Sequence, residues 1–178
     1  MSAVSTTPYL IIIAHGLNSM RIGIIGLGTV GEAIREGFES SHEIFIHDKE
    51  MGTSISDVIE NAEVAYIAVP TPSIDRTGAC DTGIVEDVLN ELPDGFRVVI
   101  KSTVIPGTTQ RLHDSFPELK IACSPEFLRS ATSVDDFKNR EILVVGSHHR
   151  DLAEIVLRNH QEAGVFSGGS FFHVSPTQ

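Results

Sequence analysis

The chain has 178 residues and a formal net charge of −11, with 13 Lys and Arg residues against 24 Asp and Glu residues. This acidic excess argues against a nucleic-acid-binding protein and against docking on an anionic membrane, because both need clustered positive charge. It does not exclude a phosphate ligand, since backbone amides can bind phosphate without net positive charge. With 41% hydrophobic residues and no apolar run of about 18 residues, the composition predicts a globular domain without a transmembrane helix.

The first 20 residues contain no Lys, Arg, Asp or Glu. Their short apolar run, Leu10–Ala14, has no basic residues before it and does not fit a secretory signal. We expect residues 1–19 to be an extension that is loosely ordered or adds one edge strand, and residues 20–178 to form one domain. Cys80 and Cys123 have no zinc-like spacing and indicate free thiols in a reducing compartment such as the cytoplasm.

From residue 21 onward, short apolar runs alternate with segments of helical periodicity. Apolar runs without polar alternation predict strands buried on both faces, and the alternation with helices predicts right-handed βαβ units. The fold class is therefore α/β: a Rossmann-like, doubly wound, mainly parallel sheet in three αβα layers. The predicted strands are 21–25, 43–47, 64–69, 97–101, 120–124 and 141–146, and the predicted helices are 32–38, 54–60, 82–92 and 151–160.

A glycine fingerprint follows the first predicted strand. Gly26, Gly28 and Gly31 stand in the pattern G-x-G-x-x-G. The first glycine permits a tight turn, the second lets the backbone approach a pyrophosphate, and the third lets the helix pack on the strand. The amides of Thr29 and Val30 are then the expected phosphate donors at the helix N-terminus.

An acidic residue ends the second predicted strand at the position where a dinucleotide site needs one. Asp48 lies 22 positions after Gly26 (48 − 26). A carboxylate there accepts hydrogen bonds from the adenosine ribose hydroxyls and repels a 2′-phosphate, so NAD is favoured over NADP. A tight glycine turn with a merely solvated Asp48 is the structural alternative.

Three later strands end in polar segments: Pro70-Thr71-Pro72, Ser102-Thr103-Val104 and Ser124-Pro125-Glu126. Each alone is typical of turn chemistry. Ligands of open α/β sheets bind beyond the carboxyl ends of the strands, so three such ends beside a dinucleotide fingerprint predict one functional site. No metal site is expected, because His148-His149 has no acid or cysteine that completes a recognisable motif.

The motifs GLGTVG, AVPTP, KSTVIPGTT, SPEFL and DDFKN, in this order, resemble the UDP-glucose/GDP-mannose dehydrogenase family. The resemblance runs from about Met20 to the C-terminus. It implies an N-terminal NAD-binding domain of an enzyme that oxidises C6 of a nucleotide-linked sugar from alcohol to acid with two NAD. The family adds a long central helix, through which its dimers largely form, and a C-terminal nucleotide-sugar domain, so a homodimer is expected of a full-length form.

The resemblance also implies roles for single residues. Thr103 would orient a catalytic water near the nicotinamide, and Glu126 would assist proton transfer and thioester hydrolysis. The backbone of Phe127 and Leu128 would contact the substrate sugar. The implied cofactor contacts are Gly26, Gly28, Thr29, Val30, Gly31, Asp48, Pro70, Thr71, Ser102 and Thr103.

The chain also departs from the family pattern. The family's nucleophilic cysteine lies in a glycine-rich segment far downstream of P-E-F-L, whereas Cys80 and Cys123 both fit structural roles. We therefore expect this chain alone to be inactive. The short link from Asp48 to Ser54 predicts that one strand of the usual order is missing, and Ser130-Ala131 replaces the family's Glu-Gly after P-E-F-L-R.

Two other readings of the sequence stay open. One alternative is a complete, non-catalytic dinucleotide-binding module or assembly partner, which the missing nucleophile motivates. Dehydrogenases of the 3-hydroxyacid or 6-phosphogluconate type share the glycine fingerprint, but nothing about them explains K-S-T-V and S-P-E-F-L together.

Overall fold

The computed structural model describes residues 19–74 and 78–176. The predicted extension over residues 1–19 lies outside the described residues except for Ser19. The described residues form a seven-stranded sheet of order β2-β1-β3-β4-β5-β6-β7. The strands are β1 (Arg21–Ile25), β2 (Glu43–His47), β3 (Val64–Ile67), β4 (Arg97–Ile100), β5 (Lys120–Cys123), β6 (Ile142–Ser147) and β7 (Ser170–Val174).

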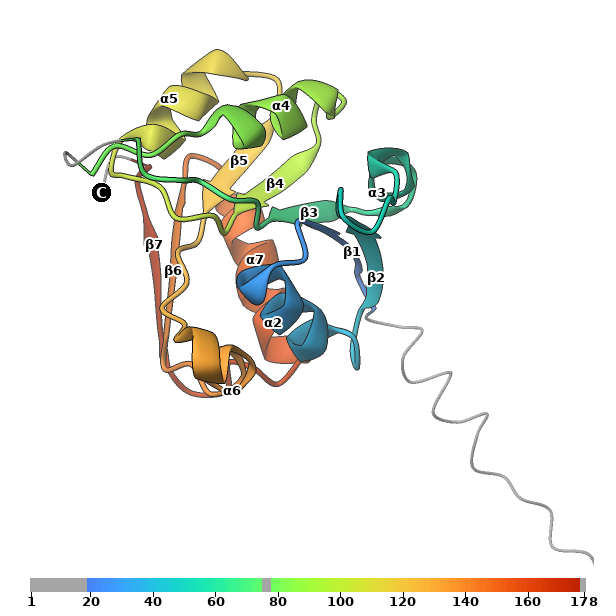
Figure 1. Cartoon of the computed structure of the whole chain (residues 1–178). Helices are drawn as coiled ribbons and strands as arrows, with labels where there is room; N and C mark the ends of the chain where they lie inside the picture. Colours follow the sequence, from blue (N-terminus) through green and yellow to red (C-terminus); the bar gives the residue numbers. More distant parts are fainter. Residues whose placement is uncertain (1–18, 75–77, 177–178) are drawn as a thin grey trace, which may run out of the picture.

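Helices cover both faces of the sheet, so the predicted three-layer αβα fold is confirmed (Figure 1). One face packs against α2, α6 and α7, and the other against α3, α4 and α5. The helices are α2 (Thr29–Phe38), α3 (Ile55–Asn61), α4 (Gly83–Glu91), α5 (Thr108–Ser115), α6 (Ser133–Lys138) and α7 (Arg150–Glu162), with a short 3₁₀ turn at Ser130–Thr132.

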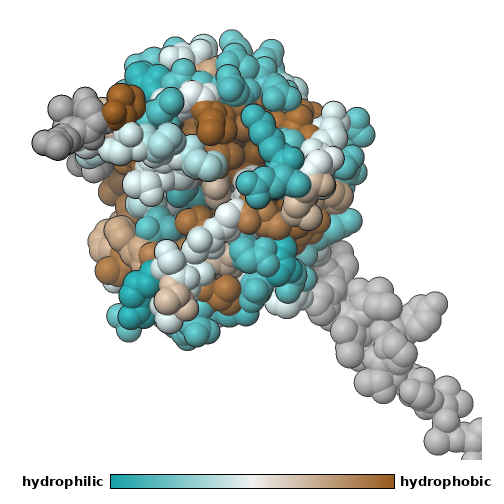
Figure 2. All heavy atoms as spheres, viewed as in Figure 1, coloured by the Kyte–Doolittle hydropathy of each residue, from teal (hydrophilic) through white to brown (hydrophobic). Residues whose placement is uncertain are grey.

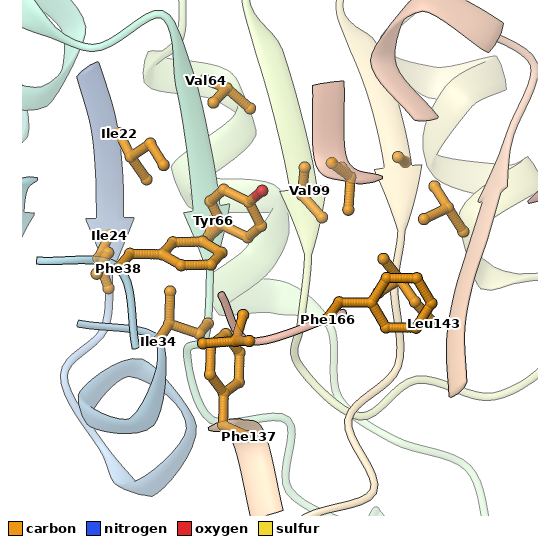
Figure 3. Packing of buried hydrophobic residues seen from close by; sticks show 14 of the residues in the cluster. Ile22, Ile24, Ile34, Phe38, Val64, Tyr66, Val99, Phe137, Leu143 and Phe166 are labelled. Carbon is orange, nitrogen blue, oxygen red and sulfur yellow. The ribbon is translucent and has the colours of Figure 1, made fainter. Parts of the chain in front are cut away.

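The core divides into two apolar clusters because side chains of a strand alternate between the faces of the sheet. Ile24 belongs to the cluster under α2 and α7, and its neighbour Ile25 to the cluster under α3 and α4. Phe38 of α2 packs edge-to-face on Tyr66 of β3 and on Phe137 of α6, with ring centroids 5.5 and 5.4 Å apart (Figure 3). These rings hold α2 against the sheet and so fix the direction of its N-terminus.

The β2 edge shows the expected shortened region. Strands β1 to β5 are all parallel, and only α3 lies between β2 and β3. Within residues 19–74 and 78–176, no strand pairs with β2 on its outer side. The link from Asp48 to Ser54 is too short for an added helix and strand.

The other end of the sheet differs from a uniformly parallel arrangement. β6 runs antiparallel to β5 and pairs with it only through Gly146 and Ser147. The rest of β6, with β7 parallel beside it, therefore extends beyond the carboxyl end of β5. The two strands form a wall next to the loop that follows β5.

Three elements were not predicted: α5, α6 and β7. The helix α5 begins after Gly107, which has φ of +88°, and the Pro-Gly-Thr segment there reads as a turn. The six residues of α6 span less than two helical turns, too few for a clear periodicity. Strand β7 has mostly exposed side chains, so it lacks the apolar run of a buried strand.

Candidate functional site

The loop between β1 and α2 is shaped by two glycines whose positions exclude a side chain. Gly26 has φ of +90°, and a Cβ atom on it would lie 2.8 Å from the carbonyl oxygen of Ala68. A Cβ atom on Gly31 would overlap the carbonyl oxygen of Gly26. The first turn of α2 thus packs directly on the end of β1, as the sequence predicts.

Gly28 differs from these two because its missing side chain leaves open space. No atom lies within 4 Å of the position that a Cβ atom would take. Gly28 is the N-cap of α2 and no side chain caps this helix, so the amides of Thr29, Val30 and Gly31 have no partner within the helix. Unpaired amides together with the helix dipole make this end of α2 suited to an anion.

Asp48 lies beside this loop, at the end of β2. Its Oδ2 accepts a hydrogen bond of 2.7 Å from the Leu27 amide and its Oδ1 one of 2.8 Å from the Glu50 amide. The Leu27 amide, the largest influence, holds the pKa of Asp48 below its ordinary value, so the side chain is an anion at neutral pH. A carboxylate has about four acceptor positions, so Asp48 can still accept from a ligand hydroxyl.

The loop and Asp48 border one groove with a cavity volume of about 610 Å³. Figure 2, which has the orientation of Figure 1, shows hydrophobic residues near the middle of the visible face, with hydrophilic residues around them. Of the predicted cofactor residues, Gly26, Gly28, Thr29, Val30, Asp48 and Pro70 line this groove. Lining residues that the sequence reading missed include Leu27, His47, Met51, Ala68, Val69, Ile84 and Val88.

The missed residues have a simple common signal. Leu27, His47, Ala68 and Val69 lie at or within two residues of a predicted strand end, and Ile84 and Val88 lie on one face of the helix predicted at 82–92. Hydrophobic residues at such places read as core, although here they also face a cavity. An adenine or nicotinamide ring needs apolar walls of this kind.

The segments after β3 and β4 are joined by hydrogen bonds. The Thr71 hydroxyl donates to the carbonyl oxygen of Thr103 over 2.6 Å, and the buried Ser102 hydroxyl donates to the carbonyl oxygen of Val69 over 2.7 Å. The Ser102 side chain therefore tightens the two strand ends together. Thr103 is exposed. None of Thr71, Ser102 and Thr103 lines the groove itself.

Glu126 lies in a buried cluster of charges. Its carboxylate forms an ion pair with Lys101 and accepts hydrogen bonds of 3.1 and 2.9 Å from the guanidinium of Arg140. The side chains of Lys101, Glu126 and Arg140 are 0%, 5% and 7% exposed. Burial lowers the pKa of Lys101.

The predicted substrate residues border a second cavity of about 490 Å³. Phe127 is 74% exposed, while Leu128 packs partly against the core. Glu126, Arg140 and Ile142 line the same cavity, and Ile142 belongs to the wall formed by β6. The structure thus places most of the predicted residues either in a groove at β1 and β2 or at a cavity by the loop after β5. Gly31, Thr71, Ser102 and Thr103 line neither.

A protein-family model decides which family has this architecture. Residues 46–163 match the NAD-binding domain of the UDP-glucose/GDP-mannose dehydrogenase family. The chain belongs to this family. The predicted cofactor, NAD, is confirmed with it, and the matched segment begins just before Asp48.

Curated members of the dehydrogenase family are similar to the chain over part of their length. A UDP-glucose 6-dehydrogenase of Haloferax volcanii is 33% identical in an alignment 143 positions long that covers 68% of this chain and 33% of that protein. A UDP-glucose 6-dehydrogenase of Pseudomonas aeruginosa is 31% identical in an alignment 129 positions long that covers 61% of this chain and 28% of that protein. The chain thus spans about a third of the length of these relatives.

Solved structures of dehydrogenases share the fold. The chain aligns with a UDP-glucose dehydrogenase of Pyrobaculum islandicum with a TM-score of 0.73 and 20% identity, over 99% of this chain and 49% of the other. It aligns with a GDP-mannose dehydrogenase of Pseudomonas aeruginosa with a TM-score of 0.71 and 22% identity, over 89% and 47%. At these identities the likeness establishes the fold alone.

The residues present in the groove fit a dinucleotide. The open space at Gly28 leaves room for a diphosphate against the α2 amides, and the Asp48 anion stands where ribose hydroxyls can reach it.

No group of three or more metal-ligating side chains among the described residues is placed to hold a metal ion. Burial raises the pKa of the Cys123 thiol, which makes it a poor nucleophile. Of the helices in the described part of the chain, none has the length and hydrophobicity to span a bilayer.

Proposed function

We propose that the chain is the cofactor half of a nucleotide-sugar 6-dehydrogenase of the UDP-glucose type. The observation that supports this most is the groove in which the glycine loop, the uncapped start of α2 and the Asp48 carboxylate meet. In this proposal residues 20–178 are one domain, and the nucleotide sugar binds between it and further parts of a longer form.

Each predicted residue has a defined task in this proposal. The amides at Thr29, Val30 and Gly31 bind the diphosphate, and Asp48 accepts hydrogen bonds from the adenosine ribose. Pro70, Thr71, Ser102 and Thr103 form the linked strand ends beside the nicotinamide, and Thr103 orients a water. When bound, NAD accepts hydride from the sugar C6.

In this proposal Glu126 is the residue that accepts a proton during the reaction. Oxidation of an alcohol releases a proton as hydride leaves, so a proton acceptor near the reacting carbon is needed, and a carboxylate can serve as one. Glu126 borders the same cavity as Phe127 and Leu128, whose backbone we assign to the sugar. The chain alone does not complete the reaction in this proposal, because the raised pKa of the partly buried Cys123 disfavours its thiolate and Cys80 lines neither cavity.

Calorimetric titration with NAD and NADP tests cofactor binding. We expect NAD to bind and NADP to bind at least about tenfold more weakly, since the Asp48 anion repels the 2′-phosphate. Asp48→Asn should lose part of this selectivity. Glu50→Gln, which changes the charge next to Asp48 but not the ribose acceptor, is the matched control. A folded sample that does not bind millimolar NAD contradicts the proposal.

Incubation with UDP-glucose and NAD tests the second part. We expect no NADH absorbance from the chain alone. Formation of NADH by pure protein would contradict the assignment of the chain as a cofactor half. A non-catalytic dinucleotide module remains the second candidate, supported by the unsuitable cysteines. Turnover on addition of the C-terminal portion of a family member would favour the dehydrogenase.

A further inference from the structure

The charges beneath the loop after β5 are unbalanced. Two cations, Lys101 and Arg140, face the single carboxylate of Glu126, and all three side chains are almost excluded from water. A buried ion pair adds little net stability compared with apolar packing, because desolvation offsets the Coulombic attraction. Its presence at the edge of the proposed substrate cavity therefore indicates a role in the site.

The two cations constrain the oxygens of Glu126 unequally. Oε1 contacts both Lys101 and Arg140, whereas Oε2 accepts a hydrogen bond only from Arg140 among the contacts of the described residues. Each carboxylate oxygen has two acceptor positions. Oε1 is thus saturated by cations, and Oε2 keeps an acceptor position.

Both cations are themselves held in place. Lys101 directly follows β4, and its Nζ donates to the Ser124 hydroxyl over 3.2 Å. Arg140 donates from Nε to the carbonyl oxygen of Phe137, and its guanidinium carbon lies 4.1 Å from the centroid of the Phe137 ring. Phe137 is fully buried against Gly37 of α2, where a Cβ atom would overlap the ring. Lys101 and Arg140, which together form a clamp on Glu126, are therefore anchored in the core on two sides.

We propose that Lys101 and Arg140 are positioning residues that hold the Glu126 carboxylate in one orientation, with Oε2 as its free acceptor. The inference rests on the proposed role of Glu126 in proton transfer, and it assigns that role to Oε2. The same clamp fixes the loop that presents the exposed Phe127 and the partly buried Leu128 to the cavity.

Carboxyl ¹³C NMR of the glutamate-labelled 178-residue chain tests the clamp at a fixed neutral pH. Loss of one resonance in Glu126→Gln assigns Glu126. Arg140→Met and Lys101→Met should each fold, because each leaves one buried cation with one carboxylate. We expect both to move the Glu126 resonance toward those of exposed glutamates. Arg140→Lys should restore the resonance only in part, since one ammonium cannot keep both the Nη2 contacts with Glu126 and the Nε hydrogen bond to the Phe137 carbonyl oxygen.

A second measurement follows the loop itself. The chain contains no tryptophan, so Phe127→Trp introduces a single fluorophore at a position that is 74% exposed. In this background, Arg140→Met and Lys101→Met should lower the fluorescence anisotropy of Trp at position 127 because the loop gains freedom. Arg150→Met, which removes an exposed ion pair with Glu154, is the matched control and should change neither signal.

The outcomes separate this inference from the proposed function. Folded Arg140→Met and Lys101→Met variants whose Glu126 resonance and loop anisotropy match the unaltered chain would overturn the clamp. Equal changes in the Arg150→Met control would also overturn it. Titration with NAD in the same samples tests the cofactor role alone, and we expect unchanged NAD affinity in all clamp variants because none lines the groove.

Discussion

The groove at β1 and β2 and the cluster around Glu126 are built in opposite ways. The groove is open, and backbone amides, glycines and one carboxylate form its polar surface. The cluster is closed, and three charged side chains from separate segments form it. The glycine loop and the carboxylate of the groove stand within 23 residues, from Gly26 to Asp48, whereas Lys101 and Arg140 are 39 positions apart (140 − 101).

This difference shows where each region is vulnerable. Backbone groups at a helix end exist whatever the side chains are, so the groove tolerates substitution unless a new atom fills it. A buried charge depends on its partners, so the cluster fails when one neutralising group is removed. The following four predictions test this contrast, from the largest expected effect to the smallest.

Neutralising the carboxylate of the cluster should have the largest effect. Glu126→Gln leaves Lys101 and Arg140 buried without an anion, and we expect a loss of about 3–5 kcal/mol in the free energy of unfolding. Urea titration measures it. Glu154→Gln, which breaks an exposed ion pair with Arg150, is the control and should change stability by less than about 0.5 kcal/mol. A similar small loss for both variants would show that the cluster is not charge-dependent.

Filling the tight packing of the glycine loop comes next. A methyl group at Gly31 overlaps the Gly26 carbonyl oxygen, which is backbone and cannot rotate away. Gly31→Ala should therefore cost about 1–3 kcal/mol of stability by overpacking, and it should also weaken NAD binding as α2 shifts. Thermal unfolding and NAD titration measure the two effects. Unchanged stability would mean that α2 does not pack on β1 as described.

Acidification should destabilise the folded chain through the buried histidine His160. Burial lowers the pKa of His160 well below that of a free imidazole, so His160 is neutral in the folded chain while it gains a proton in the unfolded chain near pH 6.5. The stability contribution is complete above that pH. Below it, the free energy of unfolding should fall by up to about 1.4 kcal/mol per pH unit, until the folded pKa is reached.

Urea titrations at several pH values between 7.5 and 5 measure this dependence, and His160→Leu should remove the part that His160 causes. Burial also lowers the pKa of His149, which acts in the same direction, so a shallower slope remains in the variant. Identical slopes in both proteins would contradict the assignment to His160.

The smallest effect on stability is expected at the open end of the groove. No atom lies within 4 Å of a Cβ atom at Gly28, so Gly28→Ala should change the free energy of unfolding by less than about 0.5 kcal/mol. The methyl group would occupy the space proposed for the diphosphate, and NAD affinity should fall by about tenfold or more. Unchanged affinity would place the diphosphate elsewhere.

Several parts of the fold could be predicted because local chemistry decides them. The predicted ranges of β1 and β2 match the structure, since both strands are short apolar runs bounded by turn residues. The roles of Gly26 and Gly31 could be predicted because a positive φ and a close helix contact are needed at those steps of the motif. Strand direction has no such local signal. The antiparallel direction of β6 therefore could not be predicted from the sequence of Ile142–Ser147.

The site around Glu126 was predictable only in part. The P-E-F-L motif marked Glu126, but nothing near it in sequence indicates Arg140 or Lys101 as a partner. Lys101 is the last residue of the strand predicted at 97–101, and its side chain is fully buried. Partners of a buried charge are selected by packing in three dimensions, so they follow no period along the chain.

The amino-acid sequence by itself determined the α/β class, the glycine loop and the acid at the end of β2. Each depends on backbone conformations that a few neighbouring residues impose. Only the tertiary structure decided that Glu126 is enclosed by two cations and that β6 extends past the sheet edge beside it. Both features depend on which distant segments pack together. For Glu126 the physical reason is the low dielectric of the interior, in which a buried charge is stable only beside an oppositely charged partner.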